Sequence, residues 1–225
     1  MIRRTPFAFA VLFALLTACA TQPANLGDLK SQLTAYHAGG AYARDLAAVD
    51  SQAAAWLRAN ASGAAKPALV LDIDETSLSS WDVIAANDFG YIAAGPCDAL
   101  PRGPCGSKAW ELSARGAAIA PTLALFNAAK AQGVAVFFIT GRPEDERAAT
   151  EKNLHAAGYD GWTGLVLKPL DSHVASAADY KAAERARIET LGYTILANVG
   201  DQPSDLAGGH ALRTFLLPNP FYRIP

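Results

Sequence analysis

Two aspartates, Asp72 and Asp74, follow a short apolar run and are two positions apart. In an extended chain such side chains point the same way, so both carboxylates can face one crevice. A third acid, Asp201, follows another apolar run, and carboxylates that lie close together repel one another. A divalent cation relieves this repulsion, and a few oxygen ligands with room for water and phosphate suit Mg2+ better than Ca2+ or Zn2+. An Asp-x-Asp pair alone also fits a helix or turn cap, but the further strand-end acids, Asp201 and Asp205, favour a cation site.

Three other residues have the chemistry to hold an anion. Thr140 and Gly141 follow an apolar run and precede Pro143, so a hydroxyl and an unobstructed backbone amide stand where a helix is expected to begin. Lys181 lies near the start of a predicted helix, where a cation gains nothing from the helix dipole and needs an anion. The alternatives are an ordinary strand-to-helix turn and a solvated helix face. Lys168, which ends another apolar run, is the reserve candidate for the cation.

The elements that position these residues indicate an α/β fold. Short continuous apolar runs, typical of buried parallel strands, alternate with helical patterns. This alternation predicts a doubly wound parallel sheet, with the ligand site outside the carboxyl ends of its strands. Residues 29–59 predict two outer helices, broken at Gly39-Gly40. The expected strands are residues 68–71, 134–139, 165–167, 195–199 and 213–217, and the expected helices between them are residues 118–131, 144–157 and 178–191.

Length and composition exclude several classes of protein. The chain of 225 residues is 51% hydrophobic and 18% charged, which excludes a disordered, collagen-like or coiled-coil protein and predicts a packed core. The formal net charge is −2 and no run of Lys and Arg is present, so we expect no nucleic-acid partner. The 4 histidines are scattered without ligand spacing, which argues against a zinc site.

The first residues have the pattern of an export signal. Two arginines precede an apolar stretch at residues 7–16 that is too short to span a bilayer as a mature helix. Residues 16–19 (LTAC) resemble a bacterial lipobox, so we expect residues 1–18 to be removed, Cys19 to be lipidated and residues 19–27 to form a polar tether. In a Gram-negative source this predicts a lipid anchor in the outer membrane and a protein that faces the periplasm. An ordinary signal peptide with an incidental cysteine is the alternative.

An insertion at residues 77–117 separates the first two polar strand ends and predicts a small cap or specificity loop over the crevice. Its two cysteines are eight positions apart, and in an exported protein they either form a disulfide or remain free thiols. Its aromatic rings either form a small core of their own, which we favour, or stack a nucleobase of the substrate. The residues concerned are Trp81, Phe89, Tyr91, Trp110, Cys97 and Cys105.

Four ordered motifs resemble those of the haloacid dehalogenase-like superfamily. Within it, the chain is similar to the acid phosphatase branch (subfamily IIIB), which includes plant vegetative storage proteins and bacterial lipoprotein acid phosphatases. The resemblance covers about residues 28–225, which we expect to form one domain. Pro203 stands where relatives often carry an aromatic residue, a departure that can alter the loop beside the metal. The motifs are residues 72–76 (DIDET), 139–142 (ITGR), 180–181 (YK) and 200–205 (GDQPSD), with a similar tail at 213–222 (RTFLLPNPFY).

The resemblance implies a catalytic role for each matching residue. Asp72 would be the nucleophile that forms an aspartyl-phosphate. Asp74 would protonate the leaving alcohol and then activate the hydrolytic water. Thr140, Gly141 and Lys181 would hold the oxygens of the transferred phosphoryl group and offset their charge.

The resemblance also implies a magnesium shell. The carboxylates of Asp72 and Asp201 and the backbone carbonyl of Asp74 would be the protein ligands, and Asp205 would orient the site from behind them. Glu75 would be a structural acid beside this shell.

The expected function is that of a magnesium-dependent acid phosphatase that hydrolyses small phosphomonoesters, with nucleotides among the candidate substrates. Arg142 would be an ion-pair partner in the site. One alternative is a surface or storage protein that keeps the fold without turnover, and the intact set of motif residues argues against it. Another is a phosphotransferase that passes the phosphoryl group to an alcohol, which the sequence does not separate from hydrolysis.

Overall fold

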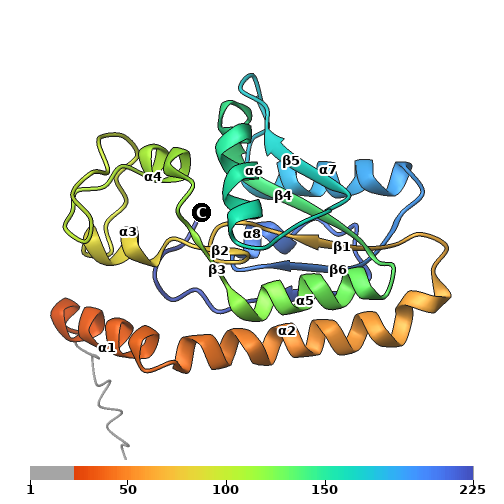
Figure 1. Ribbon diagram of the computed structural model, residues 1–225, viewed down its shortest axis with the longest axis horizontal. Coiled ribbons are helices and arrows are strands. Elements are labelled where there is room, and N and C mark those ends of the chain that lie inside the picture. The colour runs from red at the N-terminus through yellow and green to blue at the C-terminus, as the bar shows by residue number, and fades with distance from the viewer. Residues whose placement is uncertain (1–22, 225) are drawn as a thin grey trace, which may run out of the picture.

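A parallel sheet of five strands lies at the centre of the structure, a computed structural model that describes residues 23–224 (Figure 1). Each neighbouring pair is parallel, with Val70 opposite both Phe137 and Asn198. β1 lies between β4 and β6, and its apolar residues after Pro67 are all buried, as the continuous run predicts. In sheet order the strands are β5 (Gly164–Lys168), β4 (Ala135–Pro143), β1 (Pro67–Leu71), β6 (Thr194–Gly200) and β7 (Thr214–Leu216).

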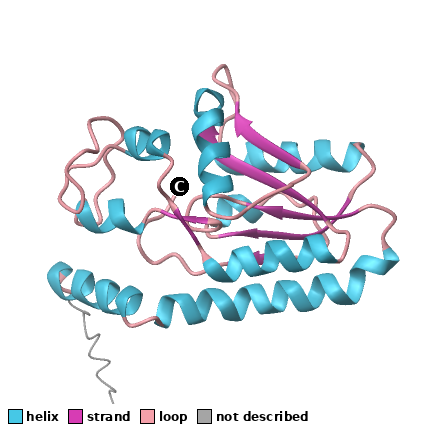
Figure 2. Ribbon diagram, in the orientation of Figure 1, coloured by secondary structure: helices cyan, strands magenta, loops and turns pink. Residues whose placement is uncertain are grey.

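Helices cover both faces of this sheet, which confirms the predicted fold class (Figure 2). Leu69 and Leu71 of β1 face a large core shared with α2, α5 and α6, whereas Val70 faces a smaller core shared with α7. Successive side chains of a strand point to opposite faces, so both faces of β1 are buried. The helices are α2 (Ala41–Asn60), α5 (Ala120–Ala131), α6 (Arg147–Ala156) and α7 (Ala177–Thr190).

Two helices precede the sheet and are separated at the predicted glycine pair. Gly40 has a φ of 73°, a left-handed conformation that suits glycine, and it joins α1 (Leu26–Ala38) to α2. The side chain of Asn25 caps α1 by accepting hydrogen bonds from the N–H groups of the first turn. α1 therefore begins inside residues 19–27, which the sequence predicts to be a tether.

The predicted signal peptide at residues 1–18 and the candidate lipidation site Cys19 lie outside the described residues. Within residues 23–224, no helix has both the length and the apolar character needed to cross a membrane.

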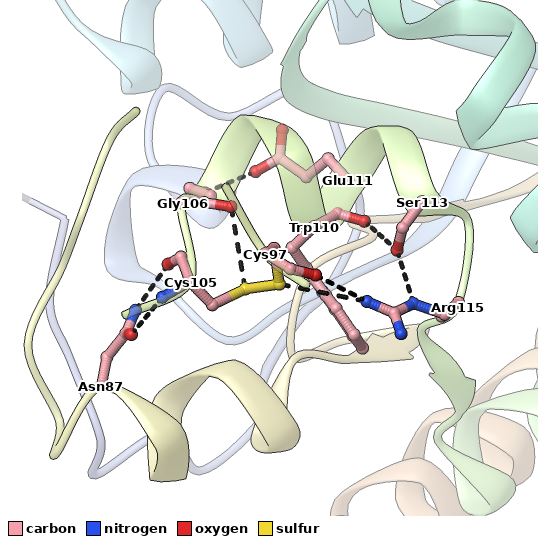
Figure 3. The surroundings of a disulfide bond; sticks show 9 residues. Asn87, Cys97, Cys105, Gly106, Trp110, Glu111, Ser113 and Arg115 are labelled. Atoms are coloured by element: carbon pink, nitrogen blue, oxygen red, sulfur yellow. Dashed lines mark hydrogen bonds between the residues drawn. A yellow bond between two sulfur atoms is a disulfide. The ribbon is translucent and has the colours of Figure 1, made fainter. Parts of the chain in front are cut away.

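The insertion after β1 forms a small unit of its own. Its two ends pair as an antiparallel ribbon of β2 (Leu78–Ser79) and β3 (Ala117–Ala118), and it contains α3 (Trp81–Ala86) and α4 (Ser107–Ser113). A disulfide joins Cys97 to Cys105 (Figure 3). The side chain of Asn87 holds the backbone of Cys105 with two hydrogen bonds of 2.8 Å. The ribbon joins the two ends of the insertion, and the disulfide closes a short loop within it.

The aromatic rings of the insertion have three different environments. Trp110 is buried with Val83 and Cys105 in a small separate core, as the favoured interpretation predicts. Trp81 instead stacks on His37 of α1, with ring centroids 3.7 Å apart, while Tyr91 is 81% exposed. Part of the aromatic content therefore attaches the insertion to the N-terminal helices.

The second strand extends further than the sequence predicts. β4 continues through Thr140 and Gly141 to Pro143, because pairing with β5 resumes where Pro143 lies opposite Lys168. The helical segment predicted at residues 144–157 nevertheless begins where expected. A short 3-10 turn, η2 (Glu144–Glu146), comes first and α6 follows it. A second such turn, η1 (Ala61–Gly63), follows α2.

A buried acid lies in the interface between α2 and α5. Asp50 is 3% exposed, and its Oδ2 accepts a hydrogen bond of 3.0 Å from the Thr122 hydroxyl. Its Oδ1 has no hydrogen-bond partner within the described part of the chain. Burial raises the pKa of Asp50 from 3.8 to about 6, against the opposing effect of the Thr122 hydrogen bond. Ionised Asp50 is therefore a source of instability at neutral pH.

We predict that Asp50→Asn makes the fold less sensitive to pH. Because the folded-state pKa is raised, the protonated carboxyl stabilises the fold fully below pH 3.8, and this contribution disappears as the pH rises through about 6. The unfolding free energy of the variant minus that of the wild type should therefore rise by about 2–3 kcal/mol between pH 4 and pH 7. Urea unfolding at both pH values measures this gain. The exposed Asp98 provides the control, and a gain as large in Asp98→Asn would contradict the assignment.

Candidate functional site

Three acidic side chains meet at the carboxyl ends of β1 and β6. Asp72 follows β1 and Asp201 follows β6, and these strands are neighbours in the sheet. Asp205 lies in α8 (Pro203–Leu206), the short helix that comes next. One oxygen of each carboxylate lies within 4.8 Å of the other two, and all three residues are buried. Gly200 permits this approach, because an added Cβ would overlap the side chain of Asp205.

Lys181 of α7 supplies the positive charge beside these acids. Its Nζ lies 2.5 Å from Oδ1 of Asp72 and 2.6 Å from Oδ1 of Asp205, and the residue is 5% exposed. The reserve candidate, Lys168, ends β5 at the edge of the sheet, two strands away from β1. The structure thus pairs Lys181, rather than Lys168, with Asp72.

Burial and mutual repulsion govern the ionisation of the cluster. Burial raises the pKa of Asp72 well above its usual value; the Lys181 charge opposes this, and Asp205 and Asp201 add to it. Burial also raises the pKa of Asp201 to about 6, with a further increase from Asp205. Burial lowers the pKa of Lys181, but Asp72 and Asp205 outweigh this effect and leave it raised, so the ammonium remains charged. One ammonium among three carboxylates leaves an excess of negative charge.

Three hydrogen-bond donors hold the Asp201 carboxylate in place. The Thr76 hydroxyl donates to Oδ1 over 2.9 Å. The side-chain amides of Gln202 and Asn219 each donate to Oδ2 over 2.7 Å. Asp201 is thus fixed by the loop after β1, by its own loop and by the C-terminal tail, and these hydrogen bonds partly offset the rise in its pKa.

Asp74 does not join the other carboxylates. Its side chain forms a bidentate ion pair with Arg142, in which Nη2 lies 2.6 Å from Oδ1 and Nε lies 3.0 Å from Oδ2. The chain bends immediately after Asp72, and the N–H groups of the next turn converge on the carbonyl of Ile73. β1 ends at Leu71 and the chain bends at Ile73, so strand alternation does not by itself place Asp74, although the Asp74 charge still acts on Asp72 and helps to raise its pKa. Arg142 is the ion-pair partner that the resemblance implies.

Thr140 and Gly141 lie on β4, directly beside β1 in the sheet. Thr140 is fully buried, and its hydroxyl accepts a hydrogen bond of 3.1 Å from the N–H of Arg142. Gly141 is exposed, and an added Cβ would meet no atom within 4 Å. The backbone at Gly141 is thus open to a ligand, on the segment that also carries the partner of Asp74.

Glu75 is a structural acid in this arrangement, as expected. It is 2% exposed with a φ of 56°, and its carboxylate accepts hydrogen bonds from the N–H of Ser80 and the hydroxyl of Tyr222. Burial raises its pKa to about 8. The residue ties the loop after β1 to the insertion and to the C-terminal tail.

A hollow of about 440 Å³ lies in the insertion, apart from the carboxylates. Trp81, Trp110 and Arg115 contribute to its lining, and none of Asp72, Asp201 and Asp205 does. The Arg115 guanidinium lies 5.5 Å from the centroid of the Trp110 ring, so part of the aromatic surface is already covered. Stacking of a nucleobase by the insertion therefore stays the less favoured alternative.

Comparison with known proteins identifies the family. The model of the HAD superfamily, subfamily IIIB (acid phosphatase), matches residues 15–225. The chain belongs to this family. It is 28% identical over 225 residues to acid phosphatase 1 of Solanum lycopersicum, and the match covers 99% of this chain and 84% of that protein.

Two further comparisons show a similar plant protein and a similar solved structure. The chain is 42% identical over 118 residues to the stem 28 kDa glycoprotein of Glycine max, a match that covers 51% of this chain and 46% of that relative. The match thus spans about half the length of this relative. The class C acid phosphatase of Bacillus anthracis superposes with a TM-score of 0.68 at 20% identity, covering 88% of this chain and 86% of that one, which shows a shared fold.

Sequence reasoning missed the residues that hold the acids in place. Thr76 and Gln202 lie inside the family motifs, but their polar side chains alone gave no reason to assign them to Asp201. Asn219 lies in the tail that resembles the family, and a polar residue in an otherwise apolar and proline-rich segment was the available signal. Thr76 and Asn219 contact Asp201 from distant parts of the chain, and Gln202 contacts it within a tight turn. A sequence motif does not reveal such contacts.

We predict that Lys181→Met destabilises the fold by about 3 kcal/mol or more, because it leaves the buried carboxylates of Asp72 and Asp205 without their counter-ion. Lys168→Met should change the unfolding free energy by only about 0.5 kcal/mol, since Lys168 is partly exposed at the sheet edge. Urea unfolding at pH 7 without divalent cations compares the two variants. A larger loss in Lys168→Met would reverse the assignment.

Proposed function

We propose that this protein is a magnesium-dependent acid phosphatase that hydrolyses small phosphomonoesters through an aspartyl-phosphate. The observation that carries the proposal is the buried contact between Lys181 and Asp72, with Asp201 and Asp205 beside them. A purely structural role gives no reason to gather three carboxylates and one lysine at the ends of two adjacent strands. Membership of the acid phosphatase subfamily supports the same reaction.

The donor set fits Mg2+. All the candidate ligands are hard oxygen atoms, and the carboxylates of Asp72, Asp201 and Asp205 lie close enough together to surround one small cation. In the proposal Asp72, Asp201 and the backbone carbonyl of Asp74 hold the ion, and Asp205 supports it through Lys181. Bound Mg2+ would neutralise the carboxylates and the phosphate oxygens of the substrate.

The first chemical step transfers the phosphoryl group to the protein. A carboxylate oxygen of Asp72 attacks phosphorus, so an Asp–O–P bond forms while the bond from phosphorus to the alcohol oxygen breaks. Asp74, which must be protonated at this stage, gives its proton to the leaving oxygen, which departs as an alcohol. Lys181 and Thr140 hold the equatorial phosphoryl oxygens, and the open amide at Gly141 supplies a further donor.

The second step returns the protein to its starting state. A water oxygen attacks phosphorus, and the Asp74 carboxylate takes a proton from that water. The Asp–O–P bond breaks, which releases phosphate and restores the Asp72 carboxylate. Arg142 holds Asp74 in one orientation through both steps, since its fork binds both carboxylate oxygens.

We predict that Asp72→Asn lowers phosphomonoester turnover by roughly a thousandfold or more, because the amide is not a nucleophile. Removal of metal with EDTA should abolish turnover of the wild type, and added Mg2+ should restore it. Release of inorganic phosphate from aryl phosphates, sugar phosphates and nucleotides is the measurement. Asp171→Asn, at an exposed acid beyond the end of β5, is the control and should keep full activity.

The same assay separates the alternatives. Wild-type activity in Asp72→Asn would refute the nucleophile assignment. A folded wild type that turns over none of these substrates with Mg2+ would be a non-catalytic surface or storage protein. Transfer to an added alcohol, seen as a new phosphomonoester in place of inorganic phosphate, would identify a phosphotransferase.

We also propose that the mature protein is a lipoprotein anchored through Cys19. The support is the sequence of residues 1–19, in which a charged start, a short apolar stretch and small residues precede the cysteine. A cysteine that carries diacylglycerol and an amide-linked acyl chain exceeds the two-signal requirement for stable anchoring.

We predict that Cys19→Ser moves the protein from the membrane fraction to the soluble fraction of a Gram-negative host, with phosphate release unchanged. Membrane fractionation and the mass of the N-terminal peptide check this. An unmodified Cys19 peptide in the wild-type protein would show that the cysteine is incidental to an ordinary signal peptide.

A further inference from the structure

The C-terminal tail contacts the candidate site at several points. After β7 ends at Leu216, Asn219 donates to Asp201 and the hydroxyl of Tyr222 donates to Glu75 over 2.7 Å each. The N–H of Ile224 donates to Oε1 of Gln202 over 3.0 Å. Figure 1 marks the C terminus near the end of the sheet toward which β1 points. The tail therefore covers the loops that carry the acidic residues.

The backbone of the tail fixes the orientation of the Asn219 side chain. Its Oδ1 accepts hydrogen bonds from the N–H groups of Phe221, over 3.0 Å, and Tyr222, over 3.4 Å. Because the oxygen is engaged by these donors, the amide nitrogen is the group that faces Asp201, 2.7 Å from Oδ2. The local turn therefore sets the direction in which the side-chain N–H of Asn219 donates to Asp201.

Aromatic packing anchors this turn to the rest of the protein. Phe221 is 7% exposed, and its ring lies 5.0 Å from that of Tyr42 in α2 and 5.2 Å from that of Trp81 in α3, between centroids. The tail is therefore held by the large core and by the insertion, independently of Asp201. A donor mounted on such an anchored turn can restrict the carboxylate that it contacts.

We propose that Asn219 is a positioning residue that sets the affinity for Mg2+ by holding the Asp201 carboxylate beside Asp72 and Asp205. This inference rests on the proposed function, which supplies the cation. Three close carboxylates repel one another, and Asp201 is kept among them by its donors from Thr76, Gln202 and Asn219. Loss of one donor lets the carboxylate rotate away. Part of the binding free energy of Mg2+ is then used to reorient the carboxylate, so the cation binds more weakly.

Two substitutions separate this role from the structure of the turn. Asn219→Ala removes both the donor to Asp201 and the acceptor for the tail amides. Asn219→Ser keeps a short hydroxyl acceptor for those amides but lacks the amide donor. Tyr222→Phe is the matched control, because it removes a hydrogen bond of equal length from the same tail to Glu75 and leaves Asp201 untouched.

The experiment is calorimetric titration of Mg2+ into full-length protein freed of metal with EDTA, with no substrate present. We expect both Asn219 variants to bind Mg2+ about 10–100-fold more weakly than wild type, and Tyr222→Phe to stay within about twofold. Phosphomonoester turnover of Asn219→Ser should recover toward the wild-type value as Mg2+ is raised, which a merely loosened fold would not show. Thermal unfolding without Mg2+ verifies that Asn219→Ser is folded.

The outcomes distinguish this inference from the proposed function. If the wild type binds no Mg2+, the proposed metal-dependent function fails. If the wild type binds Mg2+ and Asn219→Ser binds it equally well, Asn219 is not a positioning residue. If Tyr222→Phe weakens binding as much as Asn219→Ser, the tail acts as a general structural support and the specific inference is overturned.

Discussion

A lysine buried between two aspartates is the contact on which the rest of the site depends. Asp72, Asp201 and Asp205 are all removed from water, so each carries a cost of desolvation as well as repulsion from the others. Lys181 lies within salt-bridge distance of Asp72 and Asp205 and offsets part of that cost. The remaining negative charge requires hydrogen-bond donors and a cation, and these two needs explain most of the polar contacts around the cluster.

The order of strands in the sheet makes this cluster possible. β1 is central, so the residue that follows it has β4 on one side and β6 on the other. Thr140 lies on β4, and Asp201 directly follows β6. Lys181 lies on α7, which packs against the smaller core. A parallel sheet places the carboxyl ends of its strands at one edge, and segments more than a hundred residues apart in the chain therefore meet there.

Peripheral elements of the fold hold this edge in place. The insertion is attached by the β2–β3 ribbon, by the stacking of Trp81 on His37 and by the packing of Phe221 against Trp81. These contacts join α1, the insertion and the C-terminal tail into one layer over the end of the sheet. Because the tail carries both Phe221 and Asn219, the same segment that closes the core also reaches the acidic cluster. Stability of this layer and geometry of the site are thus coupled.

Local patterns in the amino-acid sequence were sufficient to predict the alternating elements, the parallel sheet, the family and most of the acidic residues at the strand ends. Continuous apolar runs and helical periodicity are local patterns, and polar residues directly after such runs are confined to one edge of a parallel sheet. These inferences need no knowledge of side-chain packing.

The tertiary structure, by contrast, sets the partners of each acidic side chain. It grouped Asp205 with Asp72 and Asp201, turned Asp74 toward Arg142, and selected Lys181 over Lys168. The turn at residues 73–78 is closed by local hydrogen bonds onto the carbonyl of Ile73, whereas the contacts of Lys181 with Asp72 and of Arg142 with Asp74 join segments far apart in the chain. The contact of Asn219 with Asp201 was hidden for a similar reason, since 18 residues separate the two and only the path of the C-terminal tail brings them together. Direction of a side chain is a property of packing, and spacing along the chain does not encode it.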